Sequence, residues 1–469
     1  MIKRQSTIYD KKFFYLLFVC IASALGGLLF GIDMLVVGGT ISQVTAQYQL
    51  SPGQVGWFVS SALAGCLLGS LISGVISDKI GRKKPLIIAA IFALVSVVGC
   101  VFANSFTALT IARLIGGFGI GIATMVSPLY ISEMSPAKHR GKLTSLFQLA
   151  ITVGIVIAIG FNAFIVNNAV NAVSSGSFFD QLFIEEMWRG MFAVELIPAL
   201  LFLIICSIFP ESPRWLIKEG REQEARTVLC KVLNEVEAEH SITDCKAAME
   251  EENKGTYKEL FTHAGKKKAL YIALFLSVVS EWSGITAVFY YGSTMIEEAL
   301  GQGGALDGFT IIAIINVLFT ILSIFMIDLL GRKKLLFIGT LGCVSALVLL
   351  SIMIDDPTTS GPTLILLFSF FVASFATAIG GVKFTVSAEI FPASIRARAM
   401  ALTTAAVWIQ GTIINAFVPT FIESFSTGSL FLLFAVILST QFIFIVKVMP
   451  ETANRTLEDI ENEILGSTC

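Results

Sequence analysis

Long apolar stretches alternate with short polar connectors along almost the whole chain. Each apolar stretch holds roughly 20 residues or more, which is the length that an α-helix needs to cross the hydrocarbon core of a bilayer. The pattern predicts twelve transmembrane helices, at residues 13–40, 54–77, 85–103, 107–130, 143–165, 190–209, 269–299, 307–330, 335–354, 362–388, 398–425 and 428–448. We therefore expect an all-α integral membrane protein.

One long polar segment, residues 211–268, divides the predicted helices into two groups of six. It is rich in Glu, Lys and Arg, and its stretch "EGREQEARTVLCKVLNEVEAE" has helical periodicity. We interpret this segment as a soluble helical linker. The predicted domains are an N-terminal six-helix bundle at 1–210, the linker at 211–268, a C-terminal six-helix bundle at 269–448, and a tail at 449–469.

Composition supports this organisation. The 469 residues are 55% hydrophobic and only 14% charged, whereas about a quarter of the residues in a soluble protein are charged. The eight Cys show no metal-binding spacing, so we expect no disulfide, metal or cofactor. Basic residues are scattered over connectors beside the membrane, which disfavours nucleic-acid binding. The chain shows no nucleophile–base pair, so we do not expect an enzyme.

Lys and Arg are distributed unevenly between the two sets of connectors. They concentrate after the second, fourth, eighth and tenth predicted helices and in the linker, whereas the connector at 297–308 holds Glu and Asp and residues 355–356 are Asp-Asp. Positive charge marks the cytoplasmic side of membrane proteins, so both termini are expected in the cytoplasm. The first apolar stretch is too long for a cleaved signal core, and the short loops suggest a bacterial inner membrane.

Three pairs of motifs recur in the same order in the two predicted bundles. They are "SDKIGRKKP" (77–85) with "IDLLGRKKL" (327–335), "SEMSPAKHRGK" (132–142) with "AEIFPASIRAR" (388–398), and "PESPRWL" (210–216) with "PETANRT" (450–456). The pairs indicate an internal duplication of six helices. Duplicated bundles are typical of transporters, whose substrate site lies near the midplane between the repeats.

Charged residues in these repeats are candidates for gating. Carboxylates at helix ends that face Arg can form ion pairs that exist in one conformer and close the inner gate. The alternative is that the basic residues only anchor the loops at the membrane surface. Exposed pairs contribute little individually, so gating would need a network. The candidates are Asp78, Arg82, Glu133, Arg140, Asp328, Arg332, Glu389 and Arg396.

Seven motifs together resemble those of the major facilitator superfamily, and within it the sugar porter family. They are "DKIGRKK", "RLIGGFGIG" (113–121), "SPLYISEMSPAKHRGKL" (127–143), "PESPRWL", "DLLGRKK", "AEIFP" and "PET", and the resemblance covers nearly the whole chain. It implies a rocker-switch carrier for monosaccharides or polyols, often driven by protons. We expect it to work as a monomer in the lipid bilayer, with a small polar solute and protons as ligands.

Five ionisable residues lie inside predicted spans, where such groups are costly and are functional candidates: Asp33, Arg113, Glu195, Glu281 and Lys383. Asp33 and Arg113 both fall in the outer half of the membrane, so we expect them to pair. The Arg favours the charged carboxylate, and separation of the pair would let a proton bind. The resembling proton-linked porters carry Asp and Arg at these two places. The alternative is a static ion pair, and Glu195 either supports Arg113 or has a structural role.

The expected substrate site departs from the family pattern. In helix 7 the family has Gln-Gln, Gly-Ile-Asn and Tyr-Tyr, whereas this chain has "SEWSGITAVFYY" (280–291). The sugar-binding Gln of helix 5 falls on Ile155, and the second Trp of helix 10 falls on Phe384. By this resemblance and by position in the spans, the candidate substrate-binding residues are Gln148, Ile155, Ser280, Glu281, Thr286, Tyr290, Tyr291, Asn316, Lys383, Phe384, Trp408 and Asn415.

The loss of amides and the gain of Glu281 and Lys383 leave several interpretations open. The two charges could bind a charged or zwitterionic group, or Glu281 could be a second proton site. Lys383 could instead extend to the membrane surface, or the two could form an internal salt bridge. The sequence predicts a proton-coupled importer of a sugar or polyol. The alternatives are a carrier of an amino acid or organic acid derivative, and a non-transporting solute sensor.

Overall fold

The computed structural model describes residues 2–136, 139–169, 177–252, 257–262, 264–391 and 393–451. Within these ranges the regular structure is helical throughout, and 12 helical segments are long and apolar enough to cross a membrane. The predicted all-α fold with twelve spans is therefore confirmed. The first span, Lys12–Tyr48, extends further than expected, because the first proline of the sequence is Pro52.

The N-terminal half contains the first six spans. The first five are the single helices α1 (Ile2–Tyr48), α2 (Pro52–Ile80), α3 (Lys83–Val101), α4 (Phe106–Met134) and α5 (Arg140–Ala169). The sixth is divided into α7 (Met187–Ala193) and α8 (Leu196–Ile208), and it follows the short α6 (Phe178–Asp180) and the π-helix η1 (Gln181–Glu185). Four short helices come next: α9 (Pro213–Lys218), α10 (Glu222–Leu229), α11 (Glu235–Glu252) and α12 (Tyr257–Thr262).

The C-terminal half contains the other six spans. Its elements are α13 (Ala264–Glu281), α14 (Ile285–Leu330), α15 (Arg332–Met353), α16 (Gly361–Ser374), the π-helix η2 (Phe375–Ile379), α17 (Gly380–Glu389), α18 (Ala393–Ser424) and α19 (Thr427–Lys447). α14 includes a kink at Gly301 and spans parts of both the seventh and eighth segments.

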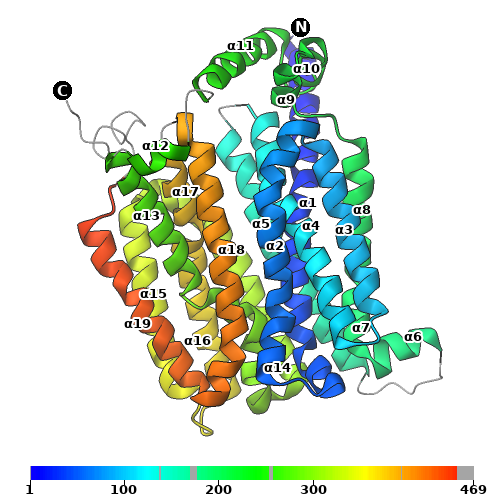
Figure 1. The fold of residues 1–469 in the computed structure, drawn as a ribbon, viewed down its shortest axis with the longest axis vertical. Helices are drawn as coiled ribbons and strands as arrows, with labels where there is room; N and C mark the ends of the chain where they lie inside the picture. Colours follow the sequence, from blue (N-terminus) through cyan, green and yellow to red (C-terminus); the bar gives the residue numbers. More distant parts are fainter. Residues whose placement is uncertain are drawn as a thin grey trace.

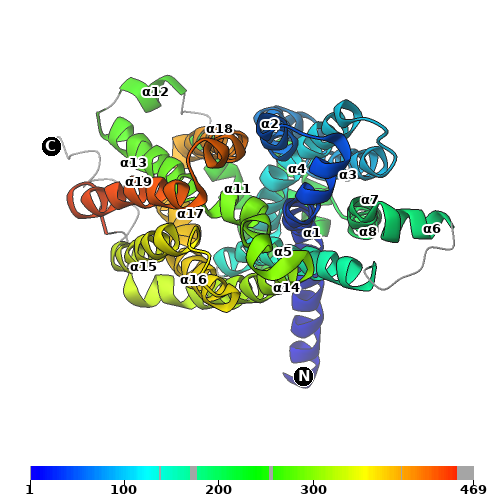
Figure 2. The same ribbon diagram turned by 90° about the horizontal axis from the view of Figure 1, so that it is seen from below.

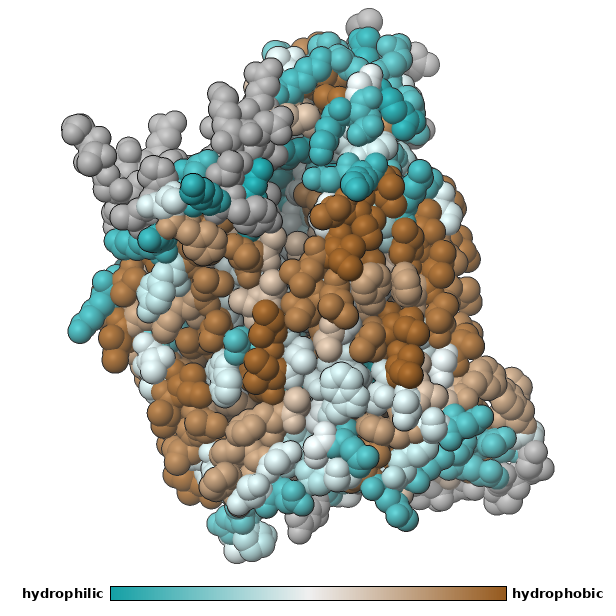
Figure 3. Space-filling view, in the orientation of Figure 1, coloured by the Kyte–Doolittle hydropathy of each residue, from teal (hydrophilic) through white to brown (hydrophobic). Residues whose placement is uncertain are grey.

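The two halves stand side by side, with α9, α10 and α11 at the same end as the N-terminus (Figures 1 and 2). We call this the linker end and the opposite one the far end. Apolar side chains form a broad belt between polar ends (Figure 3). Large apolar residues such as Ile204 and Phe325 are exposed on this belt, as expected for side chains that contact lipid.

Glycines bring α2 and α4 into direct backbone contact. A Cβ atom added at Gly65 or Gly69 of α2 would overlap the main chain of α4, and one added at Gly117 or Gly121 of α4 would overlap the main chain of α2. Small residues at helix interfaces allow this close approach in membranes. The two helices therefore pack as one layer that larger residues would separate.

The seventh span is interrupted at Gly284. Gly284 has φ +86° and lies between the end of α13 and the start of α14. This left-handed conformation favours glycine, and an added Cβ would collide with the ring of Phe434. The break places Glu281 at the end of one helix and the two tyrosines of "YY" in the first turns of the next.

Candidate functional site

Asp33 of α1 and Arg113 of α4 form a bidentate ion pair inside the N-terminal half. Arg113 Nη1 lies 2.8 Å from Asp33 Oδ1, and Nη2 lies 3.4 Å from Oδ2. Arg113 is 1% exposed and Asp33 is 6% exposed. The guanidinium also lies 5.7 Å from the ring centre of Phe58 and 5.8 Å from that of Phe192. The two charges expected to pair are therefore in contact and shielded from bulk water.

Glu195 lies next to this pair, in the short interruption between α7 and α8. It is buried, and its Oε1 atom has no hydrogen-bond partner among the described residues. Glu195 and Asp33 line the same small cavity, together with Ser96, and the cavity has space for about one water molecule. A water there could connect the two carboxylates.

A second buried ion pair lies in the C-terminal half. Lys383 Nζ of α17 lies 3.1 Å from Glu281 Oε1 of α13 and 2.9 Å from the hydroxyl of Ser280. All three residues are buried, so Lys383 does not extend to the membrane surface, and of the interpretations above the structure contains the salt bridge. An ammonium beside a carboxylate offers both a donor and an acceptor, as a single amide does.

The other oxygen of Glu281 faces the boundary between the halves. An added Cβ at Gly411 of α18 would lie 3.9 Å from Glu281 Oε2 and 3.9 Å from Leu63 of α2. No described residue forms a hydrogen bond with Oε2. This oxygen is therefore available to a solute hydroxyl, a water or a proton.

Several other polar atoms near this boundary also lack protein partners. Tyr291 donates to the carbonyl of Asn415 at 2.6 Å, and the Asn415 amide donates to the Thr286 hydroxyl at 3.3 Å. In contrast, Tyr290 Oη, Trp408 Nε1 and Asn415 Oδ1 are buried without a hydrogen bond among the described residues. Buried polar groups normally have partners, so these atoms are the natural ones to meet water or solute.

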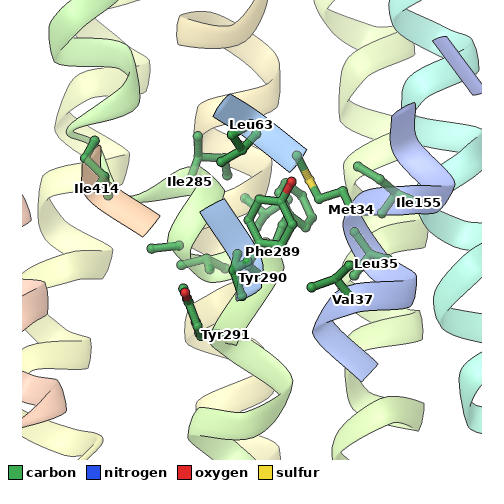
Figure 4. Close-up of a cluster of buried hydrophobic side chains, with 14 of the residues drawn as sticks. Met34, Leu35, Val37, Leu63, Ile155, Ile285, Phe289, Tyr290, Tyr291 and Ile414 are labelled. Atoms are coloured by element: carbon green, nitrogen blue, oxygen red, sulfur yellow. The ribbon is translucent and has the colours of Figure 1, made fainter. Parts of the chain in front are cut away.

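Aromatic and aliphatic side chains close around these polar atoms. Figure 4 shows Phe289 and Tyr290 of α14 beside Met34 of α1 and Leu63 of α2, with Ile414 nearby. Phe30 of α1 also packs edge-on against Trp408 of α18, with ring centres 5.4 Å apart. These contacts join the two halves through apolar surfaces.

The remaining predicted substrate residues are dispersed. Asn316 is buried and Gln148 is half-buried, whereas Ile155 is buried in the apolar cluster and has no polar atom to offer a solute. The side chain of Phe384 lies outside the described residues. The polar residues that the structure brings together are those of α13, α14, α17 and α18.

Hydrogen bonds between the two halves lie at the far end. The Ser42 hydroxyl donates to Glu297 at 2.6 Å, and the Asn167 amide lies 3.2 Å from Asp307 Oδ2. The Ser293 hydroxyl donates to the carbonyl of Gly38 at 3.3 Å. Between residues 12–209 and 264–451 as described, these are the only groups joined by hydrogen bonds. The halves are therefore fastened together at the far end, by residues that sequence reasoning did not single out.

The gating candidates at the linker end pair within each half. Arg82 Nη2 lies 2.8 Å from Glu133, and Arg332 Nη2 lies 2.8 Å from Glu389. Asp78 is largely exposed, 3.4 Å from Arg82. In each half, the pair links the loop after the second span to the end of the fourth span. Among the described residues, none of the gating candidates forms an ion pair with the other half.

Three other gating candidates need separate mention. Arg140 forms no ion pair with Glu133 in the described part of the chain. Arg396 donates from Nε to the carbonyl of Phe391 at 3.1 Å. The side chain of Asp328 lies outside the described residues.

Two carboxylates that sequence reasoning missed complete the linker-end networks. Glu211 accepts hydrogen bonds from the N–H groups of Arg82 and Lys83 at 2.7 and 3.2 Å. Glu451 accepts from the N–H groups of Arg332 and Lys333, both at 3.1 Å. Each carboxylate therefore caps the start of the third span of its half. Their recurrence in the "PES" and "PET" motifs was the available signal.

Comparisons with known proteins agree with this architecture. A model for the family "Sugar (and other) transporter" matches residues 19–464. The arabinose-proton symporter of Bacillus subtilis is 35% identical, over 95% of this chain and 94% of its own. The D-xylose-proton symporter of Escherichia coli is 32% identical, over 97% of each chain. The inward-open structure of the E. coli xylose transporter XylE superposes with a TM-score of 0.81 at 32% identity, covering 96% of this chain and all of that one.

Proposed function

Because this chain belongs to the sugar transporter family of the major facilitator superfamily, we propose that it is a proton-coupled symporter that imports a sugar or polyol by alternating access. The observation that carries the proposal is the buried Asp33–Arg113 pair beside the cavity of Glu195. A carboxylate and a guanidinium buried within membrane spans are costly, and such groups are functional candidates by default.

The geometry supports a specific coupling step. While Arg113 holds Asp33, the guanidinium compensates the charge of the carboxylate at 2.8 Å. If the two helices shift apart, the carboxylate is left in a poorly solvated site and takes up a proton. Glu195 lies on the same cavity and could pass that proton through a bridging water. Proton binding and helix movement would then depend on each other.

The far-end contacts indicate which state the structure represents. Ser42–Glu297 and Asn167–Asp307 hold the halves together at that end. The positive-inside rule would place the linker end, with both termini, in the cytoplasm. The structure then corresponds to an inward-facing state, and residues 1–210 and 269–448 would rock as two bodies around the boundary. The linker-end networks would brace each body and position its helix ends for gating.

We assign solute binding to the polar atoms that lie near the boundary between the two halves and have no hydrogen-bond partner among the described residues. Glu281 Oε2, Tyr290 Oη, Trp408 Nε1 and Asn415 Oδ1 offer acceptors and donors. The Lys383–Glu281 pair would replace the donor and acceptor of the missing amides. A neutral solute with several hydroxyl groups suits this mixture.

The direct test is uptake into proteoliposomes with an imposed pH gradient. D-xylose and L-arabinose are suitable first solutes, since the relatives named above are symporters of these pentoses, and D-glucose adds a hexose. We expect accumulation of one of them above its outside concentration, abolished by a protonophore. Uptake that only equilibrates would contradict coupling, and failure of all three to compete for binding would contradict the solute class.

The buried Lys383–Glu281 pair supports a second candidate, a sugar that carries a carboxylate. Its carboxylate could take the place of Glu281 beside Lys383 when Glu281 is protonated. D-xylose, D-glucose and D-glucuronate form a matched series, because they differ only in the group at C5. Preference for D-glucuronate that disappears in Lys383→Gln would favour this candidate, and equal loss of all three solutes would count against it.

A further inference from the structure

A basic pocket lies at the linker end of the C-terminal half. It is formed where α13 and α15 begin and α19 ends, and its volume is about 250 Å³. The lining residues are Lys268, Lys333, Val446, Lys447, Val448, Met449 and Pro450. Three spans each contribute one lysine, so the pocket gathers three positive charges around one hollow.

The described part of the chain supplies no counter-charge to these three lysines. None of the three ammonium groups has a hydrogen-bond or ion-pair partner among the described residues. The nearest carboxylate in sequence, Glu451, accepts from the backbone N–H groups of Arg332 and Lys333. Like charges gathered without a counter-ion repel one another, so the pocket favours an anion.

The pocket lies on the side of the C-terminal half away from the solute boundary. α15, α19 and the start of α13 lie on the edge of the C-terminal half that is remote from the N-terminal half (Figures 1 and 2). Tyr271, Ile443 and Val446 are exposed apolar residues on these helices. A ligand with a charged head and apolar chains would contact both surfaces at once.

The internal duplication provides a comparison within the chain. By the paired motifs, Lys333 corresponds to Lys83, whereas Lys447 corresponds to Ser207 in the N-terminal half. Lys447 is therefore not part of the repeat that both halves share. Lys447 is thus a feature of the C-terminal half alone.

We propose that this pocket binds the phosphate head group of an anionic phospholipid such as phosphatidylglycerol. The lysines would donate to the phosphate oxygens, and the acyl chains would lie along the exposed apolar residues below. Basic pockets between transmembrane helices at the membrane surface are suited to such head groups. This lipid site is separate from the solute site, so the proposal does not depend on which solute the protein carries.

The test compares lipid retention by purified full-length protein in native mass spectrometry, with phosphatidylcholine as the background lipid. The variant Lys268→Gln/Lys447→Gln removes two exposed lysines of the pocket. The control Lys84→Gln/Lys142→Gln removes two exposed lysines at the linker end of the other half. We expect wild type and control to bind phosphatidylglycerol equally, and the pocket variant to bind roughly 30-fold more weakly. Lys268→Arg/Lys447→Arg should restore binding.

Three results would overturn the proposal. Wild type could show no preference for phosphatidylglycerol, as would follow if the acidic tail at 449–469 filled the pocket. The pocket variant could retain the lipid as well as the control does. Millimolar inorganic phosphate could displace the lipid, which would mark a site for soluble anions.

Discussion

Lys383 Nζ lies 3.1 Å from Glu281 Oε1, and this contact joins the seventh and tenth spans. Asp33 and Arg113 join the first and fourth spans in the same way. Each half therefore contains one buried carboxylate–cation pair between its own first and fourth spans. The N-terminal pair is proposed to govern the proton and the C-terminal pair to face the solute.

Asp33→Asn should separate proton coupling from solute movement. The amide keeps the shape of Asp33 but cannot exchange a proton, so the variant should still catalyse solute counterflow while losing uphill uptake driven by a pH gradient. Both activities are measured in the same proteoliposomes. Equal loss of counterflow and uphill uptake, with lowered thermal stability, would instead mark the pair as a structural element.

Glu195→Gln tests whether the neighbouring carboxylate takes part in proton transfer. Its Oε1 has no partner in the part of the chain that the structure describes, so the change should leave the melting temperature nearly unaltered. We expect the pH profile of uptake to shift while counterflow at a fixed pH is preserved. Ser96→Ala is the control, because it removes a polar but not an acidic group from the lining of the same cavity. An unchanged pH profile would assign Glu195 to packing.

Single changes of the C-terminal pair should lower stability more than the double change does. Glu281→Gln or Lys383→Met alone leaves one buried charge unpaired, which costs about 3–5 kcal/mol. The double variant removes both charges and should lie closer to wild type in melting temperature. If the double variant is less stable than either single one, the pair is not energetically coupled as its geometry implies.

Gly284→Ala should be far more damaging than Gly220→Ala. Both glycines have positive φ, +86° and +75°, and a left-handed conformation costs an L-residue about 1–2 kcal/mol. Only at Gly284 would the new methyl also meet a ring, that of Phe434, whereas Gly220 faces open space. We expect losses of about 3 and about 1 kcal/mol respectively, read from thermal unfolding.

Glu133→Gln should destabilise the protein more than Glu389→Gln. The side chains of Arg82 and Glu133 are 7% and 2% exposed, whereas those of Arg332 and Glu389 are 12% and 22% exposed. Glu133 also accepts a hydrogen bond from Ser212. Losses of about 3 and about 1 kcal/mol are expected. Similar melting temperatures for the two variants would show that burial does not set the strength of these networks.

The sequence predicted the spans well because length and apolarity alone decide which segments enter a bilayer. It also predicted that Asp33 and Arg113 would pair, because both lie at similar depth in the first and fourth spans and the resembling porters carry Asp and Arg at these places. It left the Lys383–Glu281 contact as one of several possibilities, since depth does not say which faces of two helices meet. The contacts of Ser42 and Asn167 carried no signal, because they depend on how the halves are closed rather than on any local pattern.

The roles of Glu211 and Glu451 show a different limit. Their motifs were recognised as a pair, but a carboxylate after the sixth span gives no sign that it will cap the third. Only the folded structure places Glu211 beside the loop before the third span and Glu451 beside the corresponding loop of the other half. Repetition indicated that these residues matter, and geometry was needed to say for what.

The glycine contacts between α2 and α4 have a practical consequence for altering this carrier. Since any side chain at Gly65, Gly69, Gly117 or Gly121 would force the backbones apart, these positions should tolerate almost no replacement in a saturation library. Directed evolution of solute preference would do better to leave this pair of helices untouched and to randomise residues of the opposite half.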